Sequence, residues 1–192
     1  MTSTDIKSAV AEVMKDAHQV NYASRNVCLQ NLAFVYHLVI ASEDLLCLAI
    51  EQSQNTLRTY FKSHLEEEED HAKWLLSDLS TAGFNIGISP KIAVAMVGSL
   101  FYLIRYVDPC ALLGYMVLME CFSAPMAHIE ALEVMHGPEM FRTLRHHAEH
   151  DPAHGAEVLA QIDKLTDEQR VVVMDCAVQS ARYMAIASHT FK

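Results

Sequence analysis

Hydrophobic residues recur every three to four positions along most of the chain, which is the spacing of an amphipathic helix. No segment alternates apolar β-branched residues with polar ones, as a half-buried strand would. The pattern therefore predicts an all-α protein. We expect helices over residues 4–22, 28–52, 56–82, 91–105, 108–136, 139–150, 151–165 and 166–188.

Glycine, proline and capping residues mark where these helices should end or bend. Gly83 is expected to end the segment 56–82, because a glycine past the last turn readily adopts the left-handed conformation. Asp108 and Pro109 are typical of an N-cap and a first helical position. Pro125 should kink the helix over residues 108–136. A further break is expected near Ser42, and the segments 139–150 and 151–165 should be joined, or bent, at Asp151-Pro152.

Length and composition fit one globular domain that spans residues 1–192. Hydrophobic residues make up 52% and charged residues 20% of the sequence, and no repeat or low-complexity linker divides it. The formal net charge of −10 argues against nucleic acid or an anionic membrane surface as a partner. The five cysteines are odd in number and widely spaced, so we expect reduced thiols in a cytoplasmic protein.

Neither a secretory signal nor a membrane span is predicted. The first residues lack a basic segment followed by an apolar one. The most apolar run, from Ile92 to Ile104, is too short to cross a bilayer and contains a glycine and a serine. We therefore expect a soluble protein, and its apolar outer helices would allow a homodimer.

Two histidines and an aspartate share one narrow helix face late in the chain. His147, Asp151 and His154 stand at positions i, i+4 and i+7, within an arc of roughly 60°. Mixed imidazole and carboxylate ligands suit a borderline first-row metal such as iron or manganese. In a protein with 11 histidines, the same stretch could instead be a solvated helix end.

An acidic run upstream contains a second potential chelating pair. Glu68 and His71 are neighbours at i and i+3 on one face. A Glu-x-x-His pair that projects into a helical bundle is the device of carboxylate-bridged dimetal proteins. Glu67 is the rival ligand, since its i, i+4 spacing to His71 also permits chelation. Glu66 and Glu69 are expected to form a solvated face.

Glu120 is the only formally charged residue in the long apolar run from Leu112 to Phe122. An unpaired buried carboxylate is costly, so Glu120 should be paired, protonated or bound to a metal. A core glutamate bonded to a tyrosine or histidine is the alternative. As a bridging ligand, Glu120 would complete a set of three imidazoles and three carboxylates. The predicted ligands are Glu68, His71, Glu120, His147, Asp151 and His154.

Two other motifs carry weaker signals. Glu133-x-x-His136 would suit a ferritin-type site, but such a site needs a partner glutamate on a separate preceding helix. Residues 101–107 contain no glutamate, and Glu120 lies on the same predicted helix. Cys110 and Cys121 could be nucleophiles, although each lies in apolar sequence, where a buried cysteine is usually inert.

The order of these motifs resembles that of the haem-oxygenase-like diiron oxidases and oxygenases. The matching motifs are His64-x-x-Glu67-Glu68-x-x-His71-x-x-Trp74-Leu75-x-x-Asp78-Leu79, Pro109-x-Ala111-x-x-Gly114-Tyr115 followed by Glu120, and His147-x-x-x-Asp151-x-x-His154. The resemblance covers roughly residues 30–165, and the first and last predicted helices carry no matching motif. Some members separate the first glutamate and histidine more widely, which leaves the choice between Glu67 and Glu68 open.

The resemblance implies a compact bundle of about seven helices that holds two iron ions through the six predicted ligands. Manganese accepts the same nitrogen and oxygen ligands. Such enzymes activate O2 for C–H abstraction, for oxidative cleavage of fatty acids or amino acids, or for N-oxygenation in natural-product pathways. The implied partners are therefore O2, a small-molecule substrate and, for some reactions, an external electron donor.

The substrate cavity is expected beside Glu120. Its predicted lining residues, which are of types also common in an ordinary core, are Trp74, Tyr115, Met116, Met119 and Phe122. Arg105, Arg142 and Arg145 could anchor a substrate carboxylate or could simply lie at the surface.

Two other functions share parts of this pattern. A thiaminase-like hydrolase of similar fold would need a nucleophilic cysteine, and Cys110 near Tyr115 is the candidate. That function leaves the histidines at positions 147 and 154 without a purpose. A non-catalytic metal-binding protein would bind ions without substrate-dependent consumption of O2.

Overall fold

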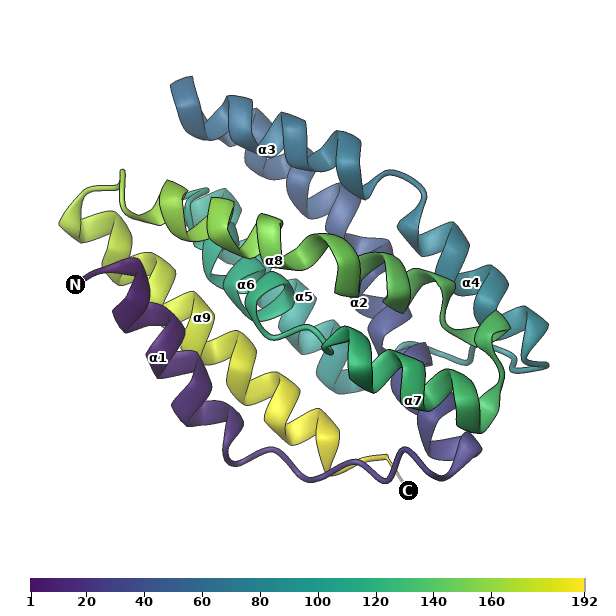
Figure 1. Ribbon diagram of the computed structural model, residues 1–192. Helices are drawn as coiled ribbons and strands as arrows, with labels where there is room; N and C mark the ends of the chain where they lie inside the picture. Colours follow the sequence, from purple (N-terminus) through teal and green to yellow (C-terminus); the bar gives the residue numbers. More distant parts are fainter. Residues whose placement is uncertain (192) are drawn as a thin grey trace.

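Helices account for nearly the whole chain in the computed structural model, which describes residues 1–191 (Figure 1). These residues contain no β-strand, so the all-α prediction is confirmed. The α-helices are α1 (Ser3–Met14), α2 (Arg25–Gln52), α3 (Asn55–Glu68), α4 (His71–Thr81), α5 (Lys91–Tyr106), α6 (Ala111–Cys121), α7 (Met126–His136), α8 (Arg142–Ile162) and α9 (Asp167–Ser188). One 3-10 helix, η1 (Pro138–Met140), precedes α8.

The short helix α6 lies at the centre of the fold, packed against α5, α8 and α9. Nine of its 11 residues are buried, and Glu120 is its only charged residue. Each large apolar side chain that α6 removes from water stabilises the fold by roughly 1.5–3 kcal/mol. The hydrophobic effect therefore strongly favours burial of α6, the helix that carries Glu120.

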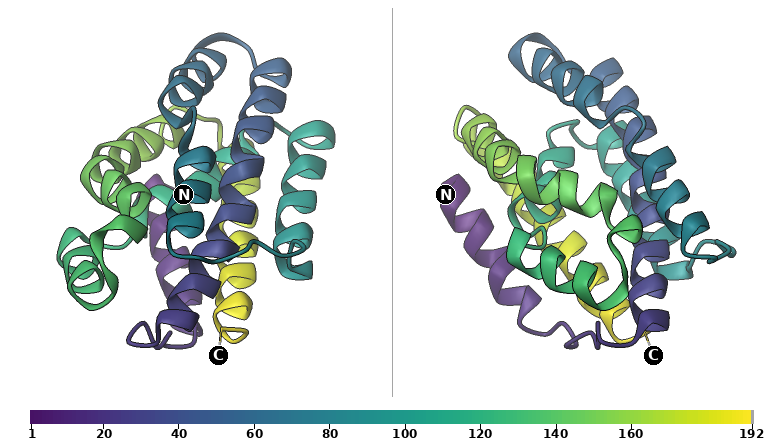
Figure 2. Two further views of the ribbon diagram at one scale, coloured as in Figure 1. Left: turned by 90° about the vertical axis from the view of Figure 1, so that its right-hand side faces the viewer. Right: turned by 45° about the vertical axis from the view of Figure 1, so that its right-hand side comes forward.

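The remaining helices surround α6 on several sides. Helices α1 and α9 pack together on one side, while α2 packs against α3, α4 and α5 on the other (Figure 2). Helix α8 crosses the molecule and contacts both α4 and α6. A smaller apolar cluster joins α2, α4, α7 and the segment around η1; its buried members are Cys28, Leu29, Leu32, Leu75, Leu79, Ile129, Leu132, Met140 and Phe141.

The predicted helix over residues 56–82 is wrong in one respect, because it is two helices. Asp70 separates α3 from α4 and has a left-handed backbone, with φ of +74°. It ends five consecutive acidic residues, whose charges repel one another within a helix, and aspartate tolerates this conformation better than most residues. Glu68 and His71 therefore lie on opposite sides of a turn rather than in mid-helix.

The predicted kink at Pro125 is also a full break. Helices α6 and α7 meet at an angle of 61°, and Pro125 is the N-cap of α7. The chain before α6 follows the predicted capping chemistry in part, since the backbone N–H of Cys110 donates to the Asp108 carboxylate at 2.8 Å. The helix itself begins later than predicted, at Ala111. These two breaks raise the helix number among residues 1–191 above the expected seven.

Three other boundaries differ from the prediction. Helix α1 is capped by Thr2 and ends at Met14, well before residue 22. Helix α2 continues unbroken past Ser42, whose hydroxyl donates to the Leu38 carbonyl. Helix α8 continues through Pro152, so the two predicted segments are joined in one helix that begins at Arg142 and ends at Ile162. The last helix begins and ends as predicted.

A buried carboxylate fixes the start of α8. The backbone N–H and hydroxyl of Thr143 both donate to the Asp78 carboxylate, at 3.0 and 2.8 Å. Asp78 lies on α4, and its oxygens satisfy donors that a helix N-terminus otherwise leaves unpaired. The contact joins α4 to α8 one turn before His147.

Helix α2 is long and apolar enough to cross a membrane, and α6 with α7 would pass only as one bent pair. Length and composition alone are weak support for a span, because core helices of soluble proteins share them. Helix α2 packs against α3, α4 and α5 within the bundle.

Gly114 allows α6 and α9 to approach closely, and its replacement tests this packing. A Cβ atom at Gly114 would lie 2.4 Å from the Val173 carbonyl oxygen, whereas one at Gly98 meets nothing within 4 Å. We predict that Gly114→Ala destabilises the protein by about 1–3 kcal/mol, because backbone must move. Gly98→Ala, at an exposed position of α5, should stabilise the protein by up to about 1 kcal/mol.

Denaturant unfolding followed by circular dichroism measures both free energies. Equal effects of the two substitutions would contradict the close helix contact.

Candidate functional site

Seven ionisable side chains gather where α3, α4, α6 and α8 meet. All six predicted ligands belong to this cluster, and His64 is the seventh member. We call the set the inner cluster: His64, Glu68, His71, Glu120, His147, Asp151 and His154. Five of the seven are buried, and only His147 and His154 are partly exposed. The prediction that Glu120 is buried is confirmed.

The inner cluster contains the same short motif twice. His64, Glu68 and His71 repeat the His-x-x-x-acid-x-x-His spacing of residues 147–154. The two copies face each other in opposite directions: the rings of His71 and His147 lie 4.8 Å apart, and those of His64 and His154 lie 5.4 Å apart. Each end of the cluster therefore holds one histidine from α3 or α4 and one from α8.

His64 is the functional residue that the sequence analysis did not assign. It appears in the quoted motif, but only Glu68 and His71 were paired there. The signal that could have found it is the repeated i, i+4, i+7 spacing. His64 is 4% exposed and stacks against Tyr60, which leaves its ring fixed inside the protein.

Glu120 lies between the two motifs at one end of the cluster. One carboxylate oxygen is 3.6 Å from His64 Nε2, and the other is 3.6 Å from His154 Nδ1. Glu68 occupies the middle, where it accepts a hydrogen bond from His71 Nδ1 at 3.0 Å. Asp151, the central residue of the second motif, likewise accepts a hydrogen bond from His147 Nδ1, at 3.0 Å, and it also lies near Glu120 and His154.

Several polar atoms of the cluster are buried without a hydrogen-bond partner among residues 1–191. They are His64 Nδ1, Glu68 Oε1, His71 Nε2, Glu120 Oε2 and His154 Nδ1. A buried group of this kind costs about 1–3 kcal/mol each, so five in one place call for a common partner. A divalent cation would be such a partner.

The ligand atoms are close enough to share metal ions. Four groups of three residues each place one potential ligand atom from every member within 4.8 Å of the others. Glu68 and Glu120 each belong to two of these groups, which is what a bridging carboxylate requires. The mixture of nitrogen and oxygen donors, without thiolate, suits iron or manganese. The residues therefore fit a dinuclear centre, and their assignment as ligands stays a prediction.

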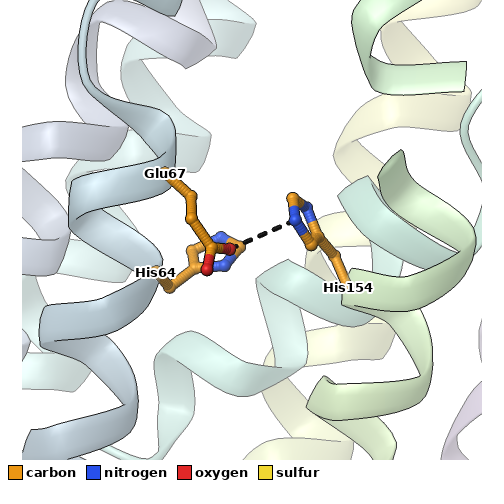
Figure 3. A group of neighbouring side chains, drawn as sticks. All are labelled: His64, Glu67 and His154. Atoms are coloured by element: carbon orange, nitrogen blue, oxygen red, sulfur yellow. Dashed lines mark ion pairs between the residues drawn. The ribbon is translucent and has the colours of Figure 1, made fainter. Parts of the chain in front are cut away.

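Glu67 and Glu68 differ in their positions relative to the inner cluster. Glu68 is buried inside the cluster, whereas Glu67 is 44% exposed at its rim. The Glu67 carboxylate points toward α8 and lies 3.1 Å from His154 Nε2 (Figure 3). Both glutamates thus reach the cluster, but Glu68 is the one held within it.

Burial would raise the pKa of Glu120, but contacts with His154 and His64 outweigh it and lower this pKa to about 2. The Glu120 carboxylate in turn raises the pKa of His154 to about 9, against the opposing effect of burial. At neutral pH the two side chains therefore form an ion pair in the metal-free protein. A metal that binds His154 must displace a proton.

A cavity of about 440 Å³ lies against the inner cluster. Four of the five predicted lining residues do line it: Tyr115, Met116, Met119 and Phe122. Trp74 does not belong to the lining; its ring packs against His71 at 4.9 Å, with the Arg142 guanidinium above it. The polar groups of the cluster form one wall, and most other walls are apolar.

No lysine or arginine of the described chain lines this cavity. The three arginines considered as substrate anchors instead form ion pairs with carboxylates of the protein. Arg105 approaches Glu51, Arg142 approaches Asp78, and Arg145 pairs with Glu133. Any anionic group of a ligand would therefore meet the inner cluster rather than a basic side chain.

The weaker motifs have structural explanations. Glu133 is held by Arg145, and His136 Nε2 bonds the Tyr22 carbonyl at 2.7 Å, so this Glu-x-x-His pair does not converge. Cys110 is fully buried, its thiol contacts the Gln169 carbonyl, and burial raises its pKa. No cysteine within residues 1–191 lines the cavity, and all five are free thiols.

The fold has known counterparts among solved structures. A domain of unknown function with a haem-oxygenase-like fold from Shewanella denitrificans is 16% identical, with a TM-score of 0.74 over 98% of this chain and 86% of that one. A TenA homologue from Pyrococcus furiosus is 9% identical, with a TM-score of 0.77 over 100% of both chains. A TenA homologue from Pseudomonas syringae pv. tomato is 11% identical, with a TM-score of 0.74 over 97% and 90%.

These likenesses confirm the haem-oxygenase-like fold. No protein-family model and no curated protein sequence matches the chain. At such low identities the structures show the fold alone, and the chemistry must be argued from the residues of the site.

The ion pair at the centre of the cluster is open to a direct titration. We predict that Glu120→Gln lowers the pKa of His154 from about 9 toward the usual 6.5, because the carboxylate that favours the imidazolium is lost. Since folding raises this pKa, protonated His154 stabilises the fold below pH 6.5, and that contribution disappears as the pH rises through about 9.

Nitrogen-15 NMR of the histidine side chains in metal-free protein follows this titration. Glu66→Gln, at an exposed position on α3, is the control and should leave it unchanged. An unaltered His154 titration in Glu120→Gln would refute the ion pair.

Proposed function

We propose that the protein is an O2-activating oxidoreductase with a dinuclear non-haem iron centre in the inner cluster. The observation that carries the proposal is the pair of facing His-x-x-x-acid-x-x-His motifs, with buried unpartnered atoms around Glu120. A structural salt-bridge network would satisfy these atoms internally. Glu120 Oε2 and His154 Nδ1 face each other as an ion pair at 3.6 Å. His64 Nδ1, Glu68 Oε1 and His71 Nε2 have no hydrogen-bond partner within residues 1–191, which favours a bound cation over a closed network.

The residues divide naturally between two ions. One end offers Glu68, His71 and His147, and the other offers Glu120, Asp151 and His154. His64 adds a further nitrogen next to Glu68 and Glu120. Bound iron would supply the redox chemistry with O2, and manganese could occupy the same ligands.

The chain's own contribution is to hold these ligands, to exclude water and to orient the substrate. The cavity walls opposite the cluster are mostly apolar, so a small substrate would bind there through its nonpolar part. Its polar or anionic end would face the ligands. Burial raises the pKa of Tyr115 in the cavity wall, so its hydroxyl stays protonated as a donor near the cluster. An external electron donor would be needed only for reactions whose substrate does not supply all the electrons.

A thiaminase-like hydrolase is the second candidate function. The fold comparisons lie nearer to it, because two of the similar structures are TenA homologues. The cysteines do not support it: Cys110 is buried away from the cavity and its pKa is raised, which disfavours the reactive thiolate. A non-catalytic metal-binding protein is the third candidate, and it would share the inner cluster but not the need for a cavity.

Iron binding tests the proposed centre. We predict that the protein binds about two Fe(II) ions per chain under anaerobic conditions, and that His147→Ala reduces this number because one end of the cluster loses a ligand. His64→Ala should weaken binding by about tenfold or more. His189→Ala, which removes an exposed histidine far from the cluster in sequence, serves as the control.

Metal analysis after equilibrium dialysis gives both numbers. Equal iron contents in wild type and His147→Ala would refute the proposed ligands. If iron binds but no compound in a substrate screen stimulates O2 consumption, the non-catalytic function gains support.

Cys110→Ala separates the oxidoreductase from the hydrolase. We predict that this variant retains the iron content and the O2 consumption of the wild type, because Cys110 touches neither the cluster nor the cavity. Cys47→Ala, at an exposed position, is the matched control. Hydrolysis of a thiamine-type substrate by the wild type, with loss of that activity only in Cys110→Ala, would establish the second candidate instead.

A further inference from the structure

Two histidines extend the inner cluster to the surface of α8. At about 100° per residue, His146, His150 and His154 follow one another around the helix at steps of about 40°. His154 belongs to the inner cluster, His146 is half-buried and His150 is exposed. The inward-facing ligands and the two outer histidines therefore form one continuous face of the helix. We call His146 and His150 the outer pair.

The spacing of the outer pair is that of a helical chelate, and the two rings lie close together. Its two rings stack with centroids 4.1 Å apart, at the i, i+4 spacing that lets two histidines share a divalent ion. His150 Nδ1 donates to the His146 carbonyl at 2.8 Å, which leaves Nε2 as the basic nitrogen directed away from the backbone. A metal-binding histidine typically has its other ring nitrogen fixed in this way.

The outer pair touches both ends of the inner cluster. The His146 ring lies 4.9 Å from that of His71, and the His150 ring lies 6.4 Å from that of His154. Trp74 supports His146 from α4, with ring centroids 5.3 Å apart. A movement of the histidine side chains would thus be enough to bring a cation from the outer pair to the inner cluster.

Negative charge surrounds the same rim. Glu67 is 44% exposed and already contacts His154, and Glu66 and Glu69 are exposed beside it on α3 and the turn that follows. These carboxylates would raise the local concentration of cations. The mechanism of the proposed centre uses neither the outer pair nor these glutamates.

We propose that the outer pair is a separate, low-affinity site for divalent first-row metal ions, which captures them from solvent and passes them to the inner cluster. The transfer role rests on the proposed function, because it needs the inner cluster to bind metal. Ions exchange from His146 and His150 to His71 and His154 by replacement of one imidazole with another. The ion keeps its oxidation state, the proton that it displaces from His154 passes to solvent, and the carboxylates of the inner cluster complete its coordination.

The rate of metal uptake tests this site apart from activity. Metal-free protein is mixed with Co(II) in a stopped-flow instrument, and the visible absorbance of bound cobalt is followed. We predict that His146→Gln with His150→Gln slows uptake several-fold but leaves the final cobalt content of the inner cluster unchanged. His18→Gln with His189→Gln, a second contacting histidine pair remote from α8 in sequence, is the matched control.

An unchanged rate in the outer-pair variant would overturn the capture role. A lower final content in the inner cluster would overturn it too, because the pair would then consist of permanent ligands. Comparison of thermal unfolding shows whether the variants are folded.

A second background separates this proposal from the proposed function. In a variant that combines His64→Ala, His71→Ala, His147→Ala and His154→Ala, both ends of the inner cluster lose their imidazoles. The outer pair should still bind Co(II) or Ni(II) weakly, and the added change His150→Gln should abolish that binding. Retained binding shows the outer site even if the wild type proves to have no inner metal centre. Absence of any weak binding in this background contradicts the outer site, whatever the inner cluster binds.

Discussion

The structure depends on keeping one carboxylate, that of Glu120, inside its most apolar helix. Removal of a charge from water is costly unless partners replace the lost solvation. Here the partners are imidazoles from α3 and α8, with His64 beside one oxygen of the Glu120 carboxylate and His154 beside the other. The positions of both helices relative to α6 therefore decide whether the charge can remain buried.

Two local features set those positions. The left-handed backbone at Asp70 ends α3 and starts α4 in a new direction, so that Glu68 and His71 both reach the same cluster. The Asp78 carboxylate holds the first turn of α8 through Thr143, which fixes the helix that carries the second motif. Neither Asp70 nor Asp78 lines the cavity, yet each positions side chains of the inner cluster.

The sequence could predict which residues gather in the inner cluster better than it could predict the path of the backbone. The helical period gave the all-α fold and the i, i+4, i+7 face of α8, and the isolated charge in an apolar run indicated that Glu120 is buried. Periodicity could not reveal the turn at Asp70, because the apolar pattern continues at helical spacing across it. Trp74 was misplaced for the same reason: the turn directs its ring toward His146 rather than the cavity. His64 was missed although its spacing to Glu68 and His71 repeats that of His147, Asp151 and His154, which was the available signal.

The most direct measurement is anomalous X-ray diffraction from crystals grown or soaked with Fe(II) in the absence of O2. The account predicts two anomalous peaks between α3–α4 and α8, with Glu68 or Glu120 next to both and His64 among the nearest ligands. Absence of peaks there, with the inner cluster closed by its own hydrogen bonds, would contradict the metal centre and favour the second candidate function.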